Sequence, residues 1–371
     1  FCKEFENNLA TLIVKFAKMY NELANILAKG KQILEVKNIC KTYQAQNGEI
    51  EALKDIKFDV KEGEYISIIG PSGCGKSTLL SIIAGLETKT AGEIDIKGKI
   101  GYMLQKDNLL EWRTIYKNVL LGLEIQKTNT LENRKYVDEL LKKYGLYEFK
   151  DKYPTQLSGG MRQRVALIRT LAIRPKVLLL DEPLGALDAK VRKQLQNEIK
   201  RLHKELGLTF ILVTHDQEEA LMLSDKIVVM SDGKIEQIGT PNEIYDTPKN
   251  LWVANFIGRT NIFSTKAISN DKILIEDTEI SLPFNNYELN AEEKINVIIR
   301  PEDLKIVELG KGIIKNAKIV DVVYKGLMYD IKCIYNNNTI NVESIHNFEI
   351  NKIVDINFDP NDIHIIKEAN E

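Results

Sequence analysis

The sequence predicts an α/β core built on a parallel sheet, followed by a smaller domain made of β-strands. Three observations support this fold class. Short apolar runs alternate with helical patterns from Ile33 to about Met230, a glycine-rich loop follows one of these runs, and short alternating segments separated by Asn, Pro and Gly fill the chain beyond Phe256. Because continuous apolar runs are typical of strands buried on both faces, we expect a parallel sheet flanked by helices. The alternating segments instead indicate a sandwich or a small barrel.

Composition sets limits on the class of protein. The 371 residues are 44% hydrophobic and 28% charged, which allows a sizeable core and two or three domains. A net charge of −2 and a pI near 6.2 give no overall electrostatic reason to expect nucleic acid or an acidic membrane surface as a partner. The four cysteines form no C-x-x-C pair, which argues against a zinc site or a disulfide framework and fits a reducing cytosol.

Residues 1–31 are predicted to form an amphipathic helical extension, because apolar residues recur at spacings of three and four until the pattern stops near Gly30. The polar face is mixed in sign. This favours packing on the body of the protein or on a copy of itself over binding to a membrane surface. No apolar stretch reaches the roughly 18 residues that a bilayer span requires, so we expect any membrane association to come through partner proteins.

The remaining chain is predicted to divide at residues 255/256, giving a first domain of residues 32–255 and a β domain of residues 256–371. A mostly helical block at about residues 105–171 forms an insertion in the first domain. An internal echo aligns residues 297–304 with residues 356–363, and it predicts two copies of a strand ending in a Pro-acid turn, with a chance match as the alternative. The predicted strands of the first domain include residues 34–36, 65–69, 177–180, 210–213 and 227–229.

A loop of the form G-x-x-x-x-G-K-[ST] lies directly between a predicted strand and a predicted helix. Its glycines let successive backbone N–H groups point at a phosphate chain, and the helix N-terminus adds positive potential. Lys76 is expected to reach the β- and γ-phosphate oxygens, and Ser77 to offer a hydroxyl to Mg²⁺. The pattern predicts a nucleoside triphosphate site, with a fortuitous glycine turn as the alternative. The loop residues are Gly70, Pro71, Ser72, Gly73, Cys74, Gly75, Lys76, Ser77 and Thr78.

Two further predicted strands end in polar residues. Asp181 and Glu182 follow an apolar run, which places them at the carboxyl edge of the sheet, where open α/β sheets bind ligands. We expect Asp181 to hold Mg²⁺ through water and Glu182 to accept a proton from an attacking water, an ordinary solvent-facing strand end being the alternative. His215 follows another such run and is expected to contact the γ-phosphate or orient the water. His203, His346 and His364 are interpreted as structural.

The segment Leu157-Ser158-Gly159-Gly160-Met161 resembles the signature of ABC-transporter ATPases. The phosphate loop, Gln105, this segment, the two acids, Asp188 and His215 stand in the order of that family. The resemblance covers roughly residues 33–250 and includes one departure, Met161 in place of the commonest glutamine.

The resemblance implies a shared site. Ser158, Gly159 and Gly160 would face the γ-phosphate of a nucleotide held by the opposite subunit, so hydrolysis would need a head-to-tail homodimer enclosing two ATP molecules. Gln105 would bind Mg²⁺, contribute to catalysis with Lys76, Glu182 and His215, and report the nucleotide state to a membrane partner. The resemblance assigns Asp188 to the D-loop between subunits. Tyr43 would stack on adenine, with a core tyrosine as the alternative.

The β domain resembles the OB-like, TOBE-type regulatory domain of importer ATPases. The chain has a single ABC ATPase domain with a short helical insertion. Both features favour a role in transport over the rival class, ABC proteins that act on nucleic acid. Several segments are most similar to spermidine/putrescine importer ATPases, whereas residues 103–114 and 120–124 are more similar to nitrate, sulfonate and taurine importers, so these and other anion or metal importers remain alternatives. The polyamine-like segments are residues 181–188, 256–263, 300–303, 324–326 and 359–364.

The same resemblance implies the partners and the location. We expect permease subunits in the membrane, an indirect link to an external solute-binding protein, no nucleic acid, and a place on the cytoplasmic face of the cell membrane. Trp112 and Tyr153 are expected to lie against a permease helix.

Overall fold

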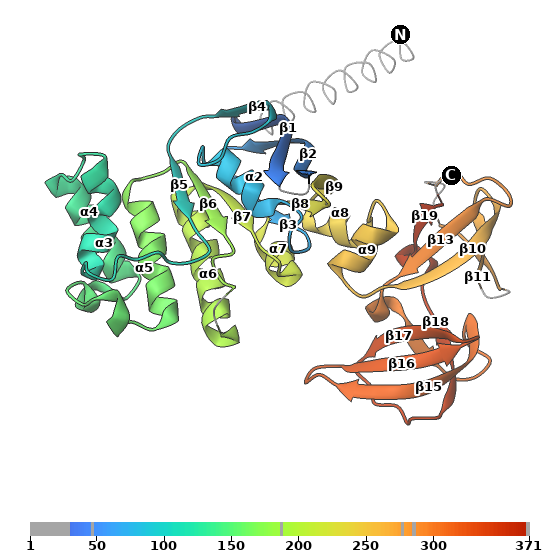
Figure 1. Ribbon diagram of the computed structural model, residues 1–371. Coiled ribbons are helices and arrows are strands. Elements are labelled where there is room, and N and C mark those ends of the chain that lie inside the picture. The colour runs from blue at the N-terminus through green and yellow to red at the C-terminus, as the bar shows by residue number, and fades with distance from the viewer. Residues whose placement is uncertain (1–29, 46–47, 186–187, 276–277, 284–286, 369–371) are drawn as a thin grey trace, which may run out of the picture. The chain divides into compact units, whose positions relative to one another are not determined.

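The computed structural model describes residues 30–45, 48–185, 188–275, 278–283 and 287–368 (Figure 1). The chain divides into two compact units, Phe1–Pro241 and Asn242–Glu371. Of the expected extension at residues 1–31, only Gly30 and Lys31 lie within the described residues. The division falls before the sequence-based boundary at residues 255/256, so the helix α9 (Leu251–Ile257) belongs to the second unit.

The first unit is built on the predicted parallel sheet. Six strands of its described residues form one sheet in the order β5-β6-β7-β3-β8-β9, in which only β9 runs antiparallel to its neighbour. Every residue of β3, β6 and β7 is buried, which confirms the interpretation of the apolar runs. The strands are β3 (Tyr65–Ile69), β5 (Ile100–Met103), β6 (Val177–Asp181), β7 (Thr209–Val213), β8 (Lys226–Ser231) and β9 (Lys234–Gly239).

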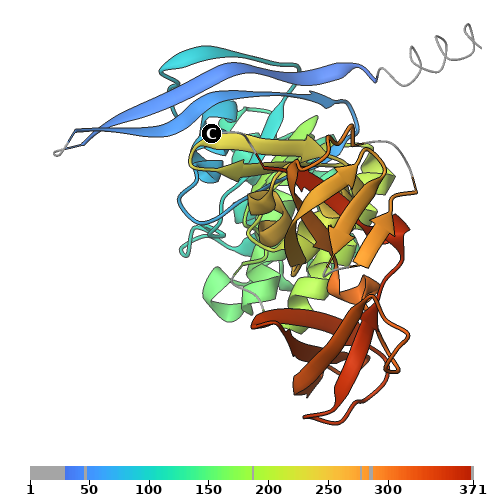
Figure 2. The same cartoon turned by 90° about the vertical axis from the view of Figure 1, so that its right-hand side faces the viewer.

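A second sheet covers part of this core. Among the described residues it contains β1 (Gln32–Ala45), β2 (Gly48–Lys61) and β4 (Ala91–Ile96), all antiparallel, and Figure 2 shows β1 and β2 as one long hairpin. Residues 34–36 lie in β1. The prediction that they belong to the parallel sheet is therefore wrong, because a short run of strand-forming residues indicates a strand but does not encode the strand with which it pairs.

The expected helical block contains α3 (Ile115–Ile125), α4 (Leu131–Lys143) and α5 (Gly159–Ala172). Thr114, Thr130 and Ser158 cap these helices by accepting hydrogen bonds from backbone N–H groups of the first turn. The sheet is flanked by α2 (Lys76–Ile83), α6 (Ala189–Leu206) and α7 (Gln217–Leu223). Short 3₁₀ turns at Tyr147–Phe149 and Pro154–Gln156 lead into α5.

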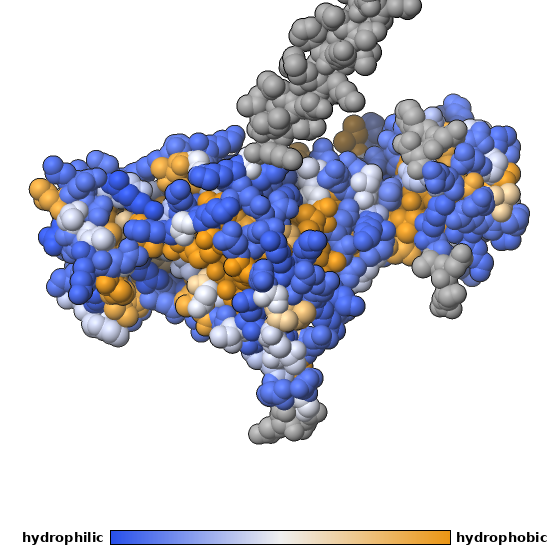
Figure 3. Space-filling view, turned by 90° about the horizontal axis from the view of Figure 1, so that it is seen from above, coloured by the Kyte–Doolittle hydropathy of each residue, from blue (hydrophilic) through white to orange (hydrophobic). Residues whose placement is uncertain are grey.

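No helix in the described part of the chain has both the length and the apolar character needed to cross a bilayer. The face seen in Figure 3 is mainly hydrophilic, with hydrophobic residues exposed in separate groups.

The second unit is an all-β domain preceded by α8 (Pro241–Asp246) and α9, as the sequence predicts. Its described residues form two antiparallel sheets, β12-β11-β10-β13-β19 and β14-β18-β15-β16-β17. The first contains β10 (Asn261–Ser269), β11 (Lys272–Ile275), β12 (Thr278–Ser281), β13 (Lys294–Ile299) and β19 (His364–Lys367). The second contains β14 (Lys305–Val307), β15 (Ile314–Tyr324), β16 (Tyr329–Tyr335), β17 (Asn338–Ser344) and β18 (Ile353–Asn357).

The two segments of the internal echo have the same local structure. Each is a strand, a 3₁₀ turn that begins at a proline, and a second strand: β13, Pro301–Asp303 and β14 in one, and β18, Pro360–Asp362 and β19 in the other. They pair crosswise, β13 with β19 and β14 with β18, so each segment passes from one sheet to the other.

A buried arginine joins the helices of the second unit to its β-strands. Arg300 is 5% exposed, and its guanidinium donates hydrogen bonds to the carbonyl oxygens of Ala254 (3.1 Å), Arg259 (3.1 Å) and Tyr245 (2.6 Å). The same guanidinium lies over the Tyr245 ring at 4.2 Å. These contacts satisfy a cation that would be costly to bury without partners.

Candidate nucleotide-binding site

The glycine loop connects β3 to α2 and is shaped by close backbone contacts. Gly75 has a φ of +100°, and a Cβ atom there would lie 2.6 Å from the Ala52 carbonyl oxygen. A Cβ at Gly70 would lie 2.2 Å from the Met230 carbonyl oxygen. Both positions therefore require glycine, and the resulting loop leads directly into the first turn of α2, whose N-cap Gly75 has no side chain to bond the helix N–H groups.

Lys76 stands at the start of α2 and is 6% exposed. Its ammonium group donates hydrogen bonds to the carbonyl oxygens of Gly70 and Pro71, both at 2.9 Å. The charge is thus held inside the loop, beside the backbone N–H groups that suit phosphate oxygens.

The two acids lie at the carboxyl edge of the sheet, where the sequence predicts them. Asp181 ends β6 and is 7% exposed, and its carboxylate accepts hydrogen bonds from the Ser77 hydroxyl (3.0 Å) and the Tyr102 hydroxyl (3.4 Å). Burial is the main reason that the pKa of Asp181 lies above its ordinary value. Sequence reasoning missed Tyr102, because a tyrosine in an apolar strand reads as a core residue.

Glu182 is the meeting point of three segments. Its Oε2 atom accepts a hydrogen bond from Gln105 Nε2 at 3.0 Å and lies 3.3 Å from His215 Nδ1. Its backbone has a φ of +42°, which is uncommon outside glycine, and its N–H donates to the Val213 carbonyl oxygen at 2.9 Å. Strained backbone held by neighbouring strands is frequent at functional sites. The structure therefore brings together three residues that the sequence proposed for catalysis.

The oxygen atoms near this edge suit a magnesium ion. Ser77 contributes a hydroxyl, Asp181 a carboxylate and Gln105 an amide oxygen, and Ser77 and Asp181 are already in contact. Mg²⁺ prefers oxygen ligands and retains several waters, so this donor set fits it.

The signature segment is placed at the N-terminus of α5. Ser158 accepts a hydrogen bond from the Met161 N–H at 3.4 Å, and both Ser158 and Gly159 are exposed. A Cβ on Gly160 would lie 2.5 Å from Val191 Cγ1, so glycine permits a close approach of α5 to α6. Asp188 caps α6 by accepting from the Val191 N–H at 3.0 Å. The signature segment and Asp188 therefore each lie at the exposed N-terminus of a helix, α5 and α6 respectively.

Tyr43 lies on β1 and is 37% exposed, so the structure does not make it a core residue. Lys41 lies over its ring, 4.7 Å from the centroid. Of the other histidines, His203 and His364 contact the backbone carbonyl oxygens of Gly63 and Pro248, each at 2.9 Å, and His346 is exposed.

An ion-pair network that the sequence did not reveal ties the Gln105 segment to α5. Arg162 donates to both carboxylate oxygens of Asp107 (2.7 and 2.9 Å) and to Glu111 (2.7 Å). Arg169, two turns further along α5, donates to the carbonyl oxygens of Asp107 (2.6 Å) and Asn108 (2.8 Å). The chain after Gln105 is therefore anchored to the helix that begins at the signature.

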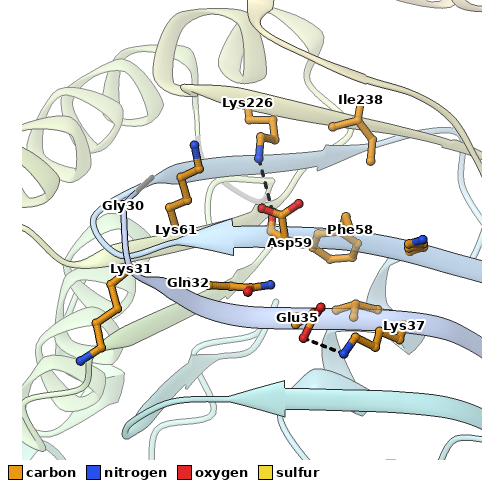
Figure 4. Close-up of a pocket in the computed structure, with 12 residues that line it drawn as sticks. Gly30, Lys31, Gln32, Glu35, Lys37, Phe58, Asp59, Lys61, Lys226 and Ile238 are labelled. Carbon is orange, nitrogen blue, oxygen red and sulfur yellow. Dashed lines mark hydrogen bonds and ion pairs between the residues drawn. The ribbon is translucent and has the colours of Figure 1, made fainter. Parts of the chain in front are cut away.

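A groove along β1 and β2 is separate from these residues. Glu35, Lys37, Asp59 and Lys226 line it, with an ion pair between Lys37 and Glu35 (2.9 Å) and a hydrogen bond from Lys226 to the Asp59 carbonyl oxygen (3.3 Å) (Figure 4). None of the site residues predicted from the sequence lines it.

A phosphate-binding loop, two acids and a histidine at one sheet edge define a P-loop nucleotide-binding protein. Residues 53–185 match the family model described as ABC transporter. The spermidine/putrescine import ATP-binding proteins PotA of Clostridioides difficile (strain 630) and Clostridium novyi (strain NT) are each 41% identical to the chain, over 92% of it and 99% of their own length. The dimeric post-hydrolysis structure of the ATP-binding cassette MJ0796 bound to ADP and Pi is similar with a TM-score of 0.52 and 36% identity, over 56% of this chain and 99% of that one. The chain belongs to this family of ABC-transporter ATP-binding proteins, which confirms the family resemblance in its sequence.

The network around Arg162 leads to the first prediction. In Arg162→Ala, residues 105–111 lose their link to α5, so Gln105 holds Glu182 less firmly and ATP hydrolysis falls by about tenfold. Hydrogen exchange of residues 105–111, followed by mass spectrometry, should increase in the same variant. The matched control is Arg113→Ala, which removes a similar pair of hydrogen bonds to Glu124 away from Gln105. Equal exchange in the variant and the wild type would contradict the anchoring role.

Proposed function

We propose that this chain is the ATP-hydrolysing subunit of a membrane importer, which couples ATP binding and hydrolysis in a homodimer to the uptake of spermidine and putrescine. The observation that carries the ATPase assignment is the convergence of Gln105 and His215 on Glu182, beside the contact between Ser77 and Asp181. Such a cluster next to a phosphate loop supplies a base, its orienting groups and a metal-binding edge in one place.

The proposed mechanism assigns a role to each of these groups. Backbone N–H groups of the loop and Lys76 bind the phosphate chain of ATP. Ser77, Asp181 and Gln105 would hold Mg²⁺, which would supply positive charge to the phosphate chain. Glu182 accepts a proton from the attacking water, and Gln105 and His215 fix the direction of its carboxylate.

We propose a head-to-tail dimer because each chain carries two half-sites. Ser158 and the N–H groups at the exposed start of α5 suit an anion, and they are a second phosphate-binding element beside the glycine loop. Asp188 caps α6 next to Val191, which packs under Gly160, so the D-loop and the signature are adjacent in one surface. The dimeric form of the related cassette MJ0796, bound to ADP and Pi, supports this arrangement.

Polyamine import is proposed from the extent of the similarity. The spermidine/putrescine import ATP-binding proteins match 92% of this chain, a range that includes much of the second unit. Nitrate, sulfonate and taurine import remains the alternative, since residues 103–114 resemble those importers. We propose that exposed apolar side chains in and near this segment meet the permease: Leu104 (40% exposed) and Trp112 (75%) within it, and Tyr153 (46%) outside it. An exposed tryptophan is typical of an interface anchor. Docking there would place the chain on the cytoplasmic face of the membrane and link it indirectly to the external solute-binding protein.

The assigned base gives a direct prediction. Glu182→Gln preserves the size of the side chain but cannot accept the proton, so the turnover number falls by about 10²–10⁴-fold while the Kd for ATP stays unchanged. Phosphate release and equilibrium nucleotide binding measure the two quantities. Glu218→Gln, at an exposed position on α7, is the control and should keep wild-type turnover. Wild-type hydrolysis by Glu182→Gln would exclude Glu182 as the base.

The shared site predicts that ATP holds two chains together. With Glu182→Gln slowing hydrolysis, addition of ATP should convert the protein from monomer to dimer in sedimentation velocity. Adding Ser158→Arg should prevent the dimer, because a long side chain at the exposed start of α5 blocks the second phosphate site, while ATP still binds to the glycine loop. A protein that stays monomeric with ATP while the wild type turns over at full rate would refute the dimer.

The solute is tested in the assembled importer. The chain is co-purified with its permease subunits, reconstituted in liposomes and supplied with the external binding protein. We expect spermidine and putrescine to stimulate ATP hydrolysis, and nitrate, taurine and other sulfonates to leave it at the basal rate. Stimulation by an anion alone would replace the polyamine assignment but leave the ATPase assignment intact.

A further inference from the structure

The turn that carries His215 is closed by a ring of hydrogen bonds. The Thr214 hydroxyl donates to Glu219 Oε2 at 2.5 Å and accepts from the Asp216 N–H at 3.0 Å. Asp216 Oδ1 in turn accepts from the Glu219 N–H at 3.1 Å, which caps α7. His215 is the middle residue of this turn. The direction of its imidazole therefore depends on Thr214, Asp216 and Glu219, which make these hydrogen bonds.

Glu219 is an unusual residue to find in this position. It is 2% exposed, and its Oε1 atom has no hydrogen-bond partner among the described residues. Burial raises the pKa of Glu219 to about 7; the hydrogen bond from Thr214 and the charges of Arg192 and His215 act to lower it, and the charge of Asp216 acts to raise it further. A buried carboxyl group is costly, which sets Glu219 apart from an ordinary helix residue.

The other groups that face Glu219 come from the neighbouring elements. Tyr65, on β3, is fully buried, and the charge of Glu219 adds to the effect of burial in raising the pKa of its hydroxyl. Arg192, on α6, pairs with Asp216 Oδ2 at 3.4 Å. Arg192 stands one turn after Asp188, the cap of α6, so Asp216 connects the D-loop helix to the turn of His215.

The same residues meet the catalytic cluster at a small cavity. Glu182, Gly185, Arg192, His215 and Glu219 all contribute to its walls. His215 Nδ1 lies 3.3 Å from Glu182 Oε2 across this region. The hydrogen bonds of Glu219 and the contact between His215 and Glu182 therefore border the same cavity.

We propose that Glu219 is a positioning residue for ATP hydrolysis, which fixes the turn of Thr214 and Asp216 so that His215 faces Glu182. The proposal rests on the function proposed above and deepens it. The uncharged carboxyl group is the form that suits this buried place. The stability that uncharged Glu219 contributes to the fold is fully present below the ordinary pKa range of a carboxyl group. It is lost as the pH rises through about 7, when a negative charge forms beside Asp216.

The test compares two substitutions in the full-length chain. Glu219→Gln retains the size and an oxygen that accepts from Thr214, but it does not ionise, so its turnover number should remain close to that of the wild type at low pH. Glu219→Ala removes the acceptor, so turnover should fall by about tenfold or more with an unchanged KM for ATP. Glu218→Ala, at the exposed neighbouring position, is the matched control and should keep wild-type turnover.

The pH profile separates positioning from mere support of the fold. The ratio of the turnover number of Glu219→Gln to that of the wild type should rise between about pH 6 and pH 8, because only the wild type acquires the buried charge. A flat ratio would overturn the proposal. A loss of ATP binding in Glu219→Ala, with no change in turnover at saturating ATP, would also overturn it.

A measurement that does not depend on ATP hydrolysis tests the role of Glu219 separately from the proposed ATPase function. Hydrogen exchange at the Asp216 and Glu219 amides should increase in Glu219→Ala and stay at the wild-type level in Glu219→Gln at low pH, in the absence of nucleotide. Unchanged exchange in Glu219→Ala refutes the positioning role whether or not the chain hydrolyses ATP. A wild type without ATPase activity would instead refute the proposed function, while increased exchange would still support the role of Glu219 in the turn.

Discussion

The register of three buried parallel strands is the constraint on which the rest of the site depends. Within the sheet, Ile68 of β3 and Asp181 of β6 both pair with Val213 of β7. The residues after these positions therefore leave the sheet side by side. The phosphate loop, the two acids and the turn of His215 meet for this reason, although they are separated by long stretches of sequence. A slip in register would move each of them relative to the others.

Around this edge, charged side chains connect the site to two helices. Arg162 and Arg169 join the segment after Gln105 to α5, and Arg192 joins the turn after His215 to α6. These helices begin at the signature and at Asp188, the elements proposed to meet a second subunit. Packed helices transmit displacement because side chains in a protein interior are packed about as densely as molecules in an organic crystal. A change at the nucleotide therefore has a physical route to the proposed dimer surface through groups that are already in contact.

The loop before Lys76, the acids after β6 and His215 after β7 each stand where an apolar run ends, so the periodicity and the glycine motif together predict their common edge. The family resemblance, and not the periodicity, named Gln105, Ser158 and Tyr43. Tyr102, the pair of Asp107 and Arg162, and Glu219 could not be found in this way. Their roles come from partners far away in the sequence or from burial on a helix, and no local pattern records such contacts.

The fold shows the same division between local and long-range information. The strands of the first unit and the all-β character of the second follow from hydrophobic patterns. The pairing of residues 34–36 in an antiparallel sheet, and the crosswise pairing of β13 with β19, depend on which strands meet. Likewise the residues of the site bear on how ATP is used, whereas in the proposed importer the solute is recognised by other subunits. The similarity to spermidine/putrescine import proteins therefore contributes information on the solute that the site itself does not contain.

The most buried strands also lead into residues whose conformation or burial costs free energy. β6 leads into Glu182 with its positive φ and ends at the buried carboxyl of Asp181, and β7 leads into the turn held by buried Glu219. Each of these features costs free energy, which apolar burial on both faces of the strands offsets. Rigid strands are also what keeps such groups from relaxing into solvent. The same burial that stabilises the sheet thus holds its polar edge in the strained arrangement that the proposed reaction requires.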